Sequence, residues 1–463
     1  MRLRFISITL LVFIACSFIY LLTPSPSFAS GYPRLGPAIH QRLKNGLQVI
    51  VAPSNNSDLA TIDVWVGAGT RRETSENNGV AHFIEHLLFK GTPSRKPGEI
   101  DAAIEDIGGS LNAATSYDWA HFYVTVASSD AETALAIMSD AIRNAELRQQ
   151  DMDKERQVIL NEMAREDDTP AKRLTKIVNG MMFGNHPYGR PLLGTEQTVS
   201  NMSRQTAIDF YHAYYVPGNT TLVISGAVSP KLGFDMAEKS FGSWSDRPLP
   251  SDNVLPAPVL PTLQVCQKSE AVSRGYLAMG FRAPSVRRRP DAYVMDVLLT
   301  LLGQGGLNRL DTDIVHNRKL ALSIESNYLT QRDPGILTIS ATFDPANLEA
   351  LVKAILDEVI NLRTAPVAPD ELAKAKHALL ASYLFDVQTT SGRANALGFY
   401  NIIDTYEYDV DYIDNFESVT SEQIQQVART YLDPESYTLA TIMPRVDTKA
   451  ARSENSTAIA RSN

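Results

Sequence analysis

The sequence predicts an α+β protein built from two similar sheet-and-helix halves. Strand and helix patterns mix without the strict alternation of a parallel α/β fold, which favours mixed or antiparallel sheets covered by helices. The order of these patterns occurs twice, on either side of a segment at 247–261 that contains five prolines. A proline-rich segment is stiff and extended, so we expect it to link two domains, at 36–246 and 262–445.

The first half begins with a predicted hairpin at 41–51. Two short apolar runs flank Asn45-Gly46, a dipeptide typical of two-residue hairpin turns. Periodicity predicts further strands at 60–66, 120–127 and 220–225, and helices at 79–90, 97–107, 130–147, 150–166, 171–183 and 203–214.

The second half shows a comparable series after the linker. Strands are predicted at 275–281, 336–343 and 437–443, and helices at 288–302, 307–317, 346–363, 369–386 and 421–431. The tail at 446–463 mixes Ser, Thr, Ala and Arg, and we expect it to be disordered.

Composition excludes several classes of protein. The 463-residue chain has a formal net charge of −9, with 44% hydrophobic and 21% charged residues, which is ordinary for a globular protein with a large core. An acidic balance argues against a nucleic-acid partner, because nucleic-acid binders carry a basic surface. Two cysteines cannot form a disulfide framework.

Residues 1–29 have the pattern of a targeting segment. Arg2 and Arg4 precede an uncharged apolar run at 5–22, and Ser27-Phe-Ala29 offers a small-residue cleavage site. The run also just reaches bilayer-spanning length, so the segment is either a cleaved signal peptide or an uncleaved anchor. We therefore expect an exported protein in the periplasm or an equivalent compartment, with membrane contact only through 5–22 if the leader stays uncleaved.

The strongest chemical signal is the pattern His82-Phe-Ile-Glu85-His86. Histidines four apart on a helix share one face and can both reach a tetrahedral Zn²⁺ at about 2.0–2.1 Å. Zinc lowers the pKa of water from about 15.7 toward 7, and Glu85 is close enough to accept the proton without being a ligand. This is the inverted form of the usual zinc-peptidase motif. The alternative is a helix whose histidines only form surface hydrogen bonds.

A zinc site needs a third protein ligand from elsewhere in the chain. The helix predicted at 150–166 carries Glu155 and Glu162, which are seven apart and therefore share a face. They can also be a solvated acidic stripe, and spacing alone does not choose between the two glutamates.

Together these motifs resemble the pitrilysin/insulinase-type zinc peptidases, and most closely the mitochondrial processing peptidase and small bacterial members. The resemblance rests on the inverted motif followed by Glu155-Arg-Gln-Val-Ile-Leu-Asn-Glu162, and it extends over most of 38–445. Further matches are Phe89-Lys-Gly-Thr92, Gly108-Gly109-Ser-Leu-Asn112-Ala113-Ala-Thr115 and His186-Pro-Tyr-Gly189.

The resemblance implies a fold and a set of roles. It implies two homologous domains that form half of a clamshell, with one Zn²⁺ per chain. By the same resemblance, His82, His86 and Glu162 are the zinc ligands. Glu85 is the catalytic base, and Glu155 is a nearby acidic residue that supports catalysis.

The resemblance also implies how substrate binds. In this family an extended peptide adds to an exposed sheet edge, and Asn112 and Ala113 match the strand that receives it. Backbone hydrogen bonds then hold the peptide while side-chain pockets select it. Asn112 beside Gly108-Gly109 is also compatible with ordinary turn chemistry. Unfolded segments and short peptides are the expected substrates.

One departure from the family concerns the second half. Active members usually contribute an Arg and a Tyr, seven residues apart, which bind substrate near the scissile bond. Val315 and Leu322 stand at those positions here. We therefore expect the zinc-bearing subunit of a heterodimer, whose sister chain supplies the Arg/Tyr pair. A self-sufficient homodimer that uses other residues is the alternative.

The function expected from the sequence is a zinc-dependent endopeptidase that cleaves unfolded peptides outside the cytoplasm. The alternative is a non-catalytic scaffold or assembly subunit of the same fold. Because such subunits typically lose the zinc motif, its presence here favours the enzyme. His121 is expected on a strand surface rather than as a fourth zinc ligand.

Overall fold

The computed structural model describes residues 35–254, 256–258, 262–305 and 308–445. The predicted leader and the predicted disordered tail lie outside these residues. From Ala38 onward the described chain forms one compact unit, and the domain boundaries at 36–246 and 262–445 stay a prediction. None of the helices in the described part of the chain combines the length and apolar character that crossing a bilayer demands.

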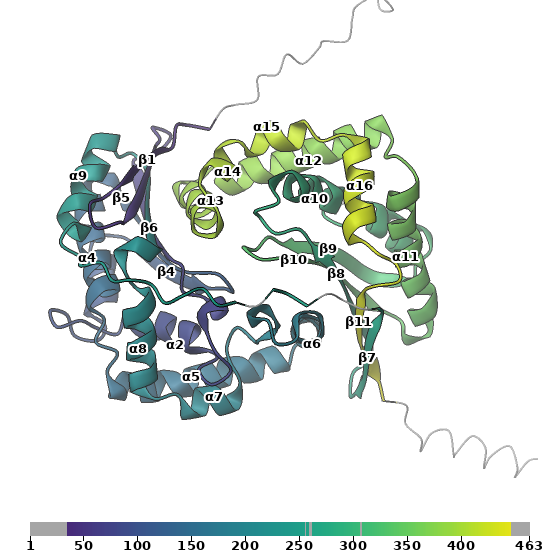
Figure 1. The fold of residues 1–463 in the computed structure, drawn as a ribbon, viewed down its shortest axis with the longest axis horizontal. Coiled ribbons are helices and arrows are strands. Elements are labelled where there is room, and N and C mark those ends of the chain that lie inside the picture. The colour runs from purple at the N-terminus through teal and green to yellow at the C-terminus, as the bar shows by residue number, and fades with distance from the viewer. Residues whose placement is uncertain (1–34, 255, 259–261, 306–307, 446–463) are drawn as a thin grey trace, which may run out of the picture. The chain divides into compact units, whose positions relative to one another are not determined.

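The first sheet has six strands in the order β1-β2-β6-β3-β5-β4 (Figure 1). β2 runs parallel to β6 and the other neighbours are antiparallel, so the sheet is mixed, as expected. Strand β4 lies at one edge. The strands are β1 (Ile39–Arg42), β2 (Gln48–Pro53), β3 (Leu59–Val66), β4 (Ser110–Thr115), β5 (Ala120–Ala127) and β6 (Thr220–Gly226).

One face of this sheet is covered by helices of the same half. In β3, Ala60, Ile62, Val64 and Val66 point into this core, because successive side chains of a strand alternate between faces. The helices of this half are α2 (Val80–Leu88), α3 (Glu99–Asp106), α4 (Ala131–Asn144), α5 (Gln149–Asp167), α6 (Pro170–Phe183), α7 (Glu196–Asn201), α8 (Arg204–Tyr214) and α9 (Pro230–Phe241).

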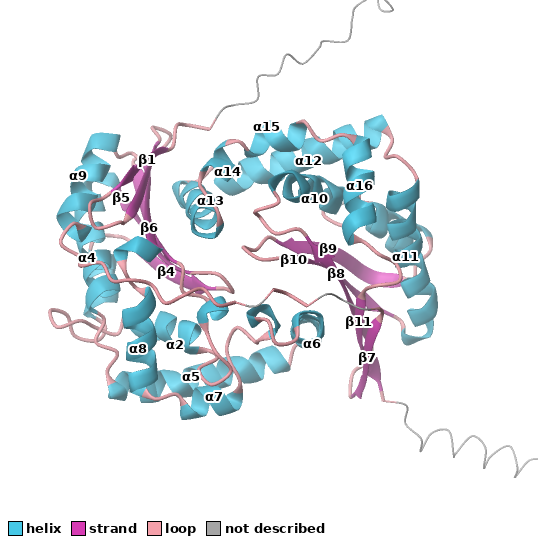
Figure 2. Cartoon of the chain, viewed as in Figure 1, coloured by secondary structure: helices cyan, strands magenta, loops and turns pink. Residues whose placement is uncertain are grey.

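The second sheet repeats the order of the first without a counterpart of β1. Its five strands run β7-β11-β8-β10-β9, with β7 parallel to β11 and the other neighbours antiparallel (Figure 2). The strands are β7 (Gln264–Glu270), β8 (Gly275–Ala283), β9 (Ala321–Leu329), β10 (Gly335–Phe343) and β11 (Thr438–Pro444). The repeat that the sequence predicts is therefore present in the strand order.

The helices of the second half follow the predicted series with additions. The segment expected as a helix at 307–317 contains the π-helical turn Asp311–Asn317. Strand β9 and helices α7, α9, α13, α14 and α15 are among the elements that were not predicted. The helices are α10 (Arg289–Leu302), α11 (Leu348–Thr364), α12 (Pro369–Val387), α13 (Thr390–Ile403), α14 (Glu407–Val410), α15 (Tyr412–Glu417) and α16 (Ser421–Tyr431).

The two halves are joined by an exchange of helices. Helix α6 of the first half packs on β8 and β11, and α13 of the second half packs on β3 and β6. Both contacts need a glycine: a Cβ at Gly398 of α13 would lie 2.1 Å from Trp65 Nε1, and one at Gly280 of β8 would lie 2.6 Å from Val178 Cγ1 of α6. Each sheet is thus completed by a helix from the other half.

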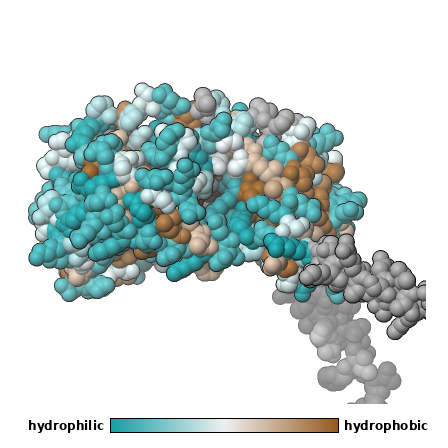
Figure 3. All heavy atoms as spheres, turned by 90° about the horizontal axis from the view of Figure 1, so that it is seen from below, coloured by the Kyte–Doolittle hydropathy of each residue, from teal (hydrophilic) through white to brown (hydrophobic). Residues whose placement is uncertain are grey.

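The surface carries some exposed apolar side chains. The face in Figure 3 is mainly hydrophilic, and its hydrophobic residues gather on the side of the second half. In that half, Leu322 near the start of β9 and Val265 of β7 are each 57% exposed. Since β7 and β9 are the two edge strands of their sheet, both side chains lie on strands that have an open edge.

Candidate metal centre

Two helices of the first half bring the predicted zinc ligands together. His82 and His86 lie on α2 and Glu162 on α5, and one ligand atom from each lies within 4.8 Å of the others. The Nε2 atoms of both histidines are 3.6 Å from Glu162 Oε2. Among the described residues, this is the single group of three such side chains.

These distances fit a zinc ion. A tetrahedral zinc with bonds of about 2.0–2.2 Å keeps its ligand atoms roughly 3.3–3.6 Å apart. Two imidazoles and one carboxylate also match the ligand set of catalytic zinc sites, which leave the fourth position for water or substrate. The residues present therefore fit the metal, and their roles as ligands remain a prediction.

The sequence of α2 explains why its histidines face α5. Val80, Phe83, Ile84 and Leu87 are buried in the core of the first half, which fixes one face of the helix. His82, Glu85 and His86 then fall on the remaining face.

Glu155 lies beside the group of three and contacts His86 and Lys90. Its Oε2 lies 3.1 Å from His86 Nδ1 and its Oε1 lies 2.9 Å from Lys90 Nζ. Contacts of this kind fix the tautomer and orientation of a metal-binding histidine. Spacing alone did not say which glutamate faces the histidines. In the structure, Glu162 faces Nε2 of both histidines, whereas Glu155 contacts Nδ1, on the other side of the His86 ring.

His82 has the electrostatic environment of a neutral imidazole. Burial, and then the charge of His86, lower the pKa of His82 to about 4, against a smaller opposing effect of Glu166. A neutral imidazole is the form that binds metals. The Nδ1 atom of His82 is buried and has no partner among the described residues, so His82 lacks the support that Glu155 gives to His86.

Glu85 has the environment of a proton acceptor. Burial raises the pKa of this carboxyl, while the neighbouring Thr115 hydroxyl and the charge of His86 act against the rise. A carboxylate whose pKa moves toward the operating pH is a better general base. The catalytic role of Glu85 stays a prediction.

Strand β4 carries the predicted substrate-binding residues beside the metal centre. β4 contacts α2, and it pairs with β5 on one side only. Asn112 is exposed, and its Oδ1 accepts a hydrogen bond from the Ala113 N–H at 3.0 Å. A peptide that adds to this edge could replace that side-chain acceptor with its own carbonyl.

The positions where the family has its Arg/Tyr pair carry two aliphatic side chains. Val315 is half-buried within the π-helical turn, and Leu322 is 57% exposed near the start of β9. Neither can bind a carbonyl or carboxylate, because neither has a hydrogen-bond donor in its side chain.

The prediction that His121 lies on a strand surface is wrong. His121 is only 4% exposed, and its Nδ1 lies 3.2 Å from Asp63 Oδ1. The reason is that α13, which was not predicted, covers this face of the first sheet. Other polar residues near the site were also missed, because neither Glu73 nor Lys90 stands at a spacing that indicates chemistry.

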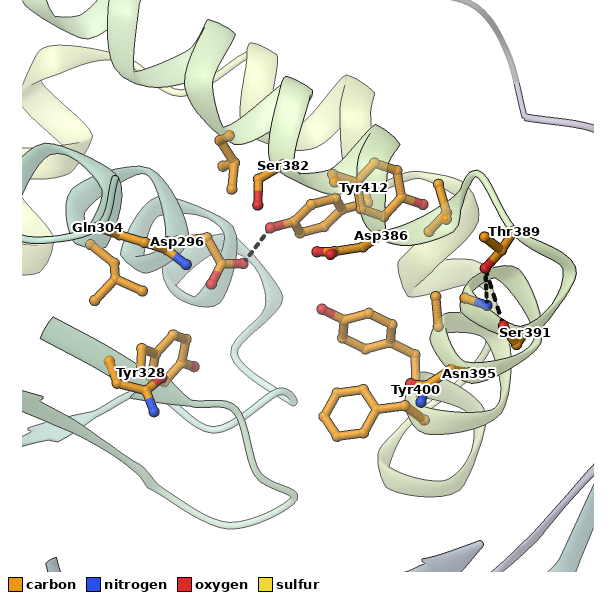
Figure 4. Close-up of a pocket in the computed structure, with 18 of the residues that line it drawn as sticks. Asp296, Gln304, Tyr328, Ser382, Asp386, Thr389, Ser391, Asn395, Tyr400 and Tyr412 are labelled. Carbon is orange, nitrogen blue, oxygen red and sulfur yellow. Dashed lines mark hydrogen bonds between the residues drawn. The ribbon is translucent and has the colours of Figure 1, made fainter. Parts of the chain in front are cut away.

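A separate cavity is lined mainly by α10, α12, α13, α15 and β9 of the second half, and Asp63 of β3 and Tyr123 of β5 also line it (Figure 4). Its volume is about 570 Å³, and Asp296 inside it accepts a hydrogen bond of 3.0 Å from the Tyr412 hydroxyl. Tyrosines and carboxylates line much of it, including Tyr328, Tyr383, Tyr400 and Asp386.

Comparisons with known proteins identify the family. Residues 49–196 match the domain family described as insulinase (peptidase family M16), and residues 201–379 match the peptidase M16 inactive domain. A Mycobacterium leprae protein named as an uncharacterized zinc protease is 30% identical over 402 residues, which are 84% of this chain and 88% of the relative. The chain belongs to the M16 peptidase family.

Two further relatives agree with this assignment. An Arabidopsis thaliana protein named as a mitochondrial-processing peptidase subunit beta is 28% identical over 419 residues, covering 88% of this chain and 78% of that protein. The crystal structure of a protease from Helicobacter pylori has a TM-score of 0.84 at 25% identity, covering 89% of this chain and all of that one. This M16 chain thus shares its fold with solved relatives, and the similarity to zinc proteases supports a metallopeptidase.

Proposed function

We propose that this M16 chain is a zinc-dependent endopeptidase that cleaves extended, unfolded peptides. One observation carries the proposal: His82, His86 and Glu162 form a zinc-sized cluster, with Glu85 on the same helix face and an open sheet edge next to it. Only an extended segment can add to such an edge as a further strand, so folded proteins are poor substrates.

The residues of the chain would divide the chemistry between them. When bound, zinc supplies a Lewis acid that acidifies water and polarises a peptide carbonyl. Glu85 would accept a proton from the attacking water and pass it to the leaving amine. Glu155 would hold His86 in the orientation seen in the structure, and backbone groups of Asn112 and Ala113 would align the peptide.

We propose that the active form includes a second, related subunit. Val315 and Leu322 replace the Arg/Tyr pair that the resemblance implies near the scissile bond, so this half of the site lacks donors for the substrate. The 57% exposure of Leu322 leaves that position open to contact with another chain. One M16 relative is itself named as a subunit of a processing peptidase, which supports a paired arrangement.

We also propose that the enzyme works outside the cytoplasm. Support comes from the sequence of residues 1–29, which lie outside the described part of the structure. Fractionation of cells that express the full chain tests this, since a cytoplasmic location of the mature protein would contradict it.

The subunit proposal has a direct test by substitution. Cleavage of an unstructured peptide by residues 30–463 is measured for the unchanged chain and for a Val315→Arg/Leu322→Tyr variant. Restoring the missing pair is expected to raise chelator-sensitive cleavage at least about tenfold, the usual value of one charge-assisted contact. The matched control places the same side chains at two other exposed positions, Leu263 just before β7 and Val265 within it, as Leu263→Arg/Val265→Tyr.

The outcomes separate the proposals. Equal activity of all three proteins would contradict the need for an Arg/Tyr pair. A complete absence of cleavage, even with a sister subunit that carries the pair, would contradict the peptidase itself and favour a scaffold subunit.

A further inference from the structure

The helix that carries the zinc motif is held at its start by a carboxylate from outside the motif. Glu73 is 4% exposed, and its Oε2 accepts hydrogen bonds from the Gly79 N–H at 2.9 Å and from Asn78 Nδ2 at 2.7 Å. Its Oε1 accepts a third from the Ala81 N–H at 2.9 Å. Ala81 is the residue immediately before His82.

Helix α2 has no other cap at this end. Gly79 occupies the cap position and has no side chain, and the first N–H groups of a helix have no partner within it. A negative charge at a helix N-terminus is also favoured by the helix dipole. Glu73 therefore does the work that a Ser, Asp or Asn cap would do, and does it from a separate segment.

The segment that carries Glu73 is tied to the second half through Arg71. Arg71 is 6% exposed, and its Nε donates to Asp333 Oδ2 at 2.7 Å, in the loop between β9 and β10. Its Nη1 donates to Asp252 at 2.8 and 2.9 Å, in the proline-rich segment. This buried arginine lies within a short 3-10 turn, Thr70–Arg72, which ends directly before Glu73.

The same turn is fixed to the end of the substrate strand. The Thr70 N–H donates to the Ser116 carbonyl at 3.2 Å, and the Arg71 N–H donates to the Tyr117 carbonyl at 2.7 Å. Ser116 directly follows β4. The segment 70–73 thus contacts the strand that would receive peptide, the helix that would bind zinc, and the loop Arg332–Asp333 of the second half.

We propose that Glu73 is a positioning residue for the metal centre, and that Arg71 couples it to the second half through Asp333. This rests on the zinc site of the proposed function, but not on the peptidase activity. Glu73 sets the start of α2 and with it the direction of His82 and Glu85, which lie within the next two turns. A movement of the Arg332–Asp333 loop would be transmitted to α2 through residues 71–73, since Arg71 contacts the loop and Glu73 contacts the helix.

The test uses the full chain in mild detergent, with Co²⁺ in place of zinc as a spectroscopic probe of ligand geometry. Glu73→Ala is expected to change the visible cobalt spectrum, to weaken zinc binding about tenfold, and to lower kcat with little change in KM. Glu73→Gln keeps one acceptor oxygen and is expected to fall between Glu73→Ala and the unchanged chain. In the metal-free chain, hydrogen exchange at Gly79 and Ala81 should accelerate in the same order.

Two controls separate positioning from a general loss of stability. Asp409→Asn removes a different buried carboxylate, one that accepts from Tyr383 at 2.7 Å and pairs with Arg393 in the second half. It should lower stability and leave the cobalt spectrum unchanged. If Glu73→Ala behaves as Asp409→Asn does, with an unchanged spectrum and unchanged zinc affinity, the positioning role is overturned.

The coupling through Arg71 is tested against a variant that removes a different contact between the two halves. Asp333→Asn removes the acceptor charge from Arg71 and is expected to shift the cobalt spectrum in the same direction as Glu73→Gln, by a smaller amount. Asn401→Ala removes another contact between the halves, the 2.8 Å bond from Asn401 Nδ2 to Thr221 Oγ1, and should leave the spectrum unchanged. Equal spectra for Asp333→Asn and Asn401→Ala would overturn the coupling.

Loss of peptide cleavage in every protein, with these spectral differences intact, would contradict the proposed function alone.

Discussion

The two halves of the chain place the same framework around very different groups. In the first half, α2 packs on α5 and on the edge strand β4, and their side chains form the cluster of His82, His86 and Glu162. In the second half, α10 packs on α12 and on the edge strand β9 in the same way. The cavity of about 570 Å³ with Asp296 and a set of tyrosines borders that location and also reaches Asp63 and Tyr123 of the first sheet.

The difference lies in what the paired helices supply. Burial raises the pKa of Asp296 to about 7, with the Tyr412 hydrogen bond acting against the rise, so this carboxyl is easily kept neutral. None of the described residues that line the cavity is a histidine. The framework therefore places paired helices beside an edge strand in both halves. Among the described residues, only the helices of the first half bring two histidines and a carboxylate together as a metal could bind them.

Replacing one carboxyl in each half gives the sharpest contrast. Glu85→Gln is expected to lower kcat for peptide cleavage by about 10²- to 10⁴-fold, because the proton acceptor is lost while the ligands remain. Asp296→Asn, at the corresponding cavity of the second half, should leave kcat unchanged. Cleavage rates together with zinc content measured by mass spectrometry check both. A loss of zinc in Glu85→Gln would mean that the residue acts through metal binding instead.

The exchanged helices allow the two sheets to be compared directly. Gly398→Val and Gly280→Val should each lower the free energy of unfolding by about 1–3 kcal/mol, since each forces a helix away from the sheet that it covers. Denaturant unfolding of both variants measures this. The disturbed contacts are Gly398 with Trp65 and Gly280 with Val178. If only one variant is destabilised, the exchange does not join the halves symmetrically.

Of the two histidines, only His86 has a carboxylate at its Nδ1 atom in the described part of the structure, so replacing that carboxylate should affect zinc affinity. Glu155→Gln should weaken zinc binding by about 10- to 100-fold, because it removes the charged partner of His86 Nδ1. Zinc competition with a chromogenic chelator measures the affinity. Lys90→Met, which leaves Glu155 in place, should have a smaller effect. Unchanged affinity in Glu155→Gln would show that His86 does not need this contact.

The contact between the halves should weaken in acid. Although burial pushes the pKa of Asp333 upward, the nearby His186 imidazole, whose Nε2 lies 3.7 Å away, and the hydrogen bond from Arg71 hold it well below its ordinary value. Since this pKa is lower in the folded chain, the stabilisation is present above about pH 4 and is lost as the pH falls through the folded-state pKa. Screening limits the effect to on the order of 1 kcal/mol. Denaturant midpoints at pH 3 and 6 should therefore differ less in Asp333→Asn.

The sequence predicts the repeated framework well, and the reason is periodicity. Nearly all of the long amphipathic helices follow their expected ranges, as α5 at Gln149–Asp167 and α16 at Ser421–Tyr431 show. Strand β9 and helix α13 are among the elements that were missed. In β9, Leu322 is exposed and Ser326 is buried, which blurs the apolar–polar alternation of a strand. Helix α13 buries a face against β3 and β6, strands far earlier in the chain, which local pattern cannot indicate.

The metal site shows the same limit. Motif and resemblance name the three predicted ligands, but the separate position of Glu155 depends on how α5 lies against α2. The burial of His121 depends on contacts with a distant segment, whereas Glu73 caps α2 from nearby in the chain but outside the spacing of the usual helix caps. Such contacts leave no spacing rule in the sequence, so the structure was needed to find them.

The most direct test of this account is the zinc content of the chain under native conditions. Native mass spectrometry of the unchanged chain, of His82→Ala and of Asp296→Asn measures it. One zinc is expected in the unchanged chain and in Asp296→Asn, and none in His82→Ala. A zinc that persists in His82→Ala, or that is lost in Asp296→Asn, would contradict a metal centre confined to the first half.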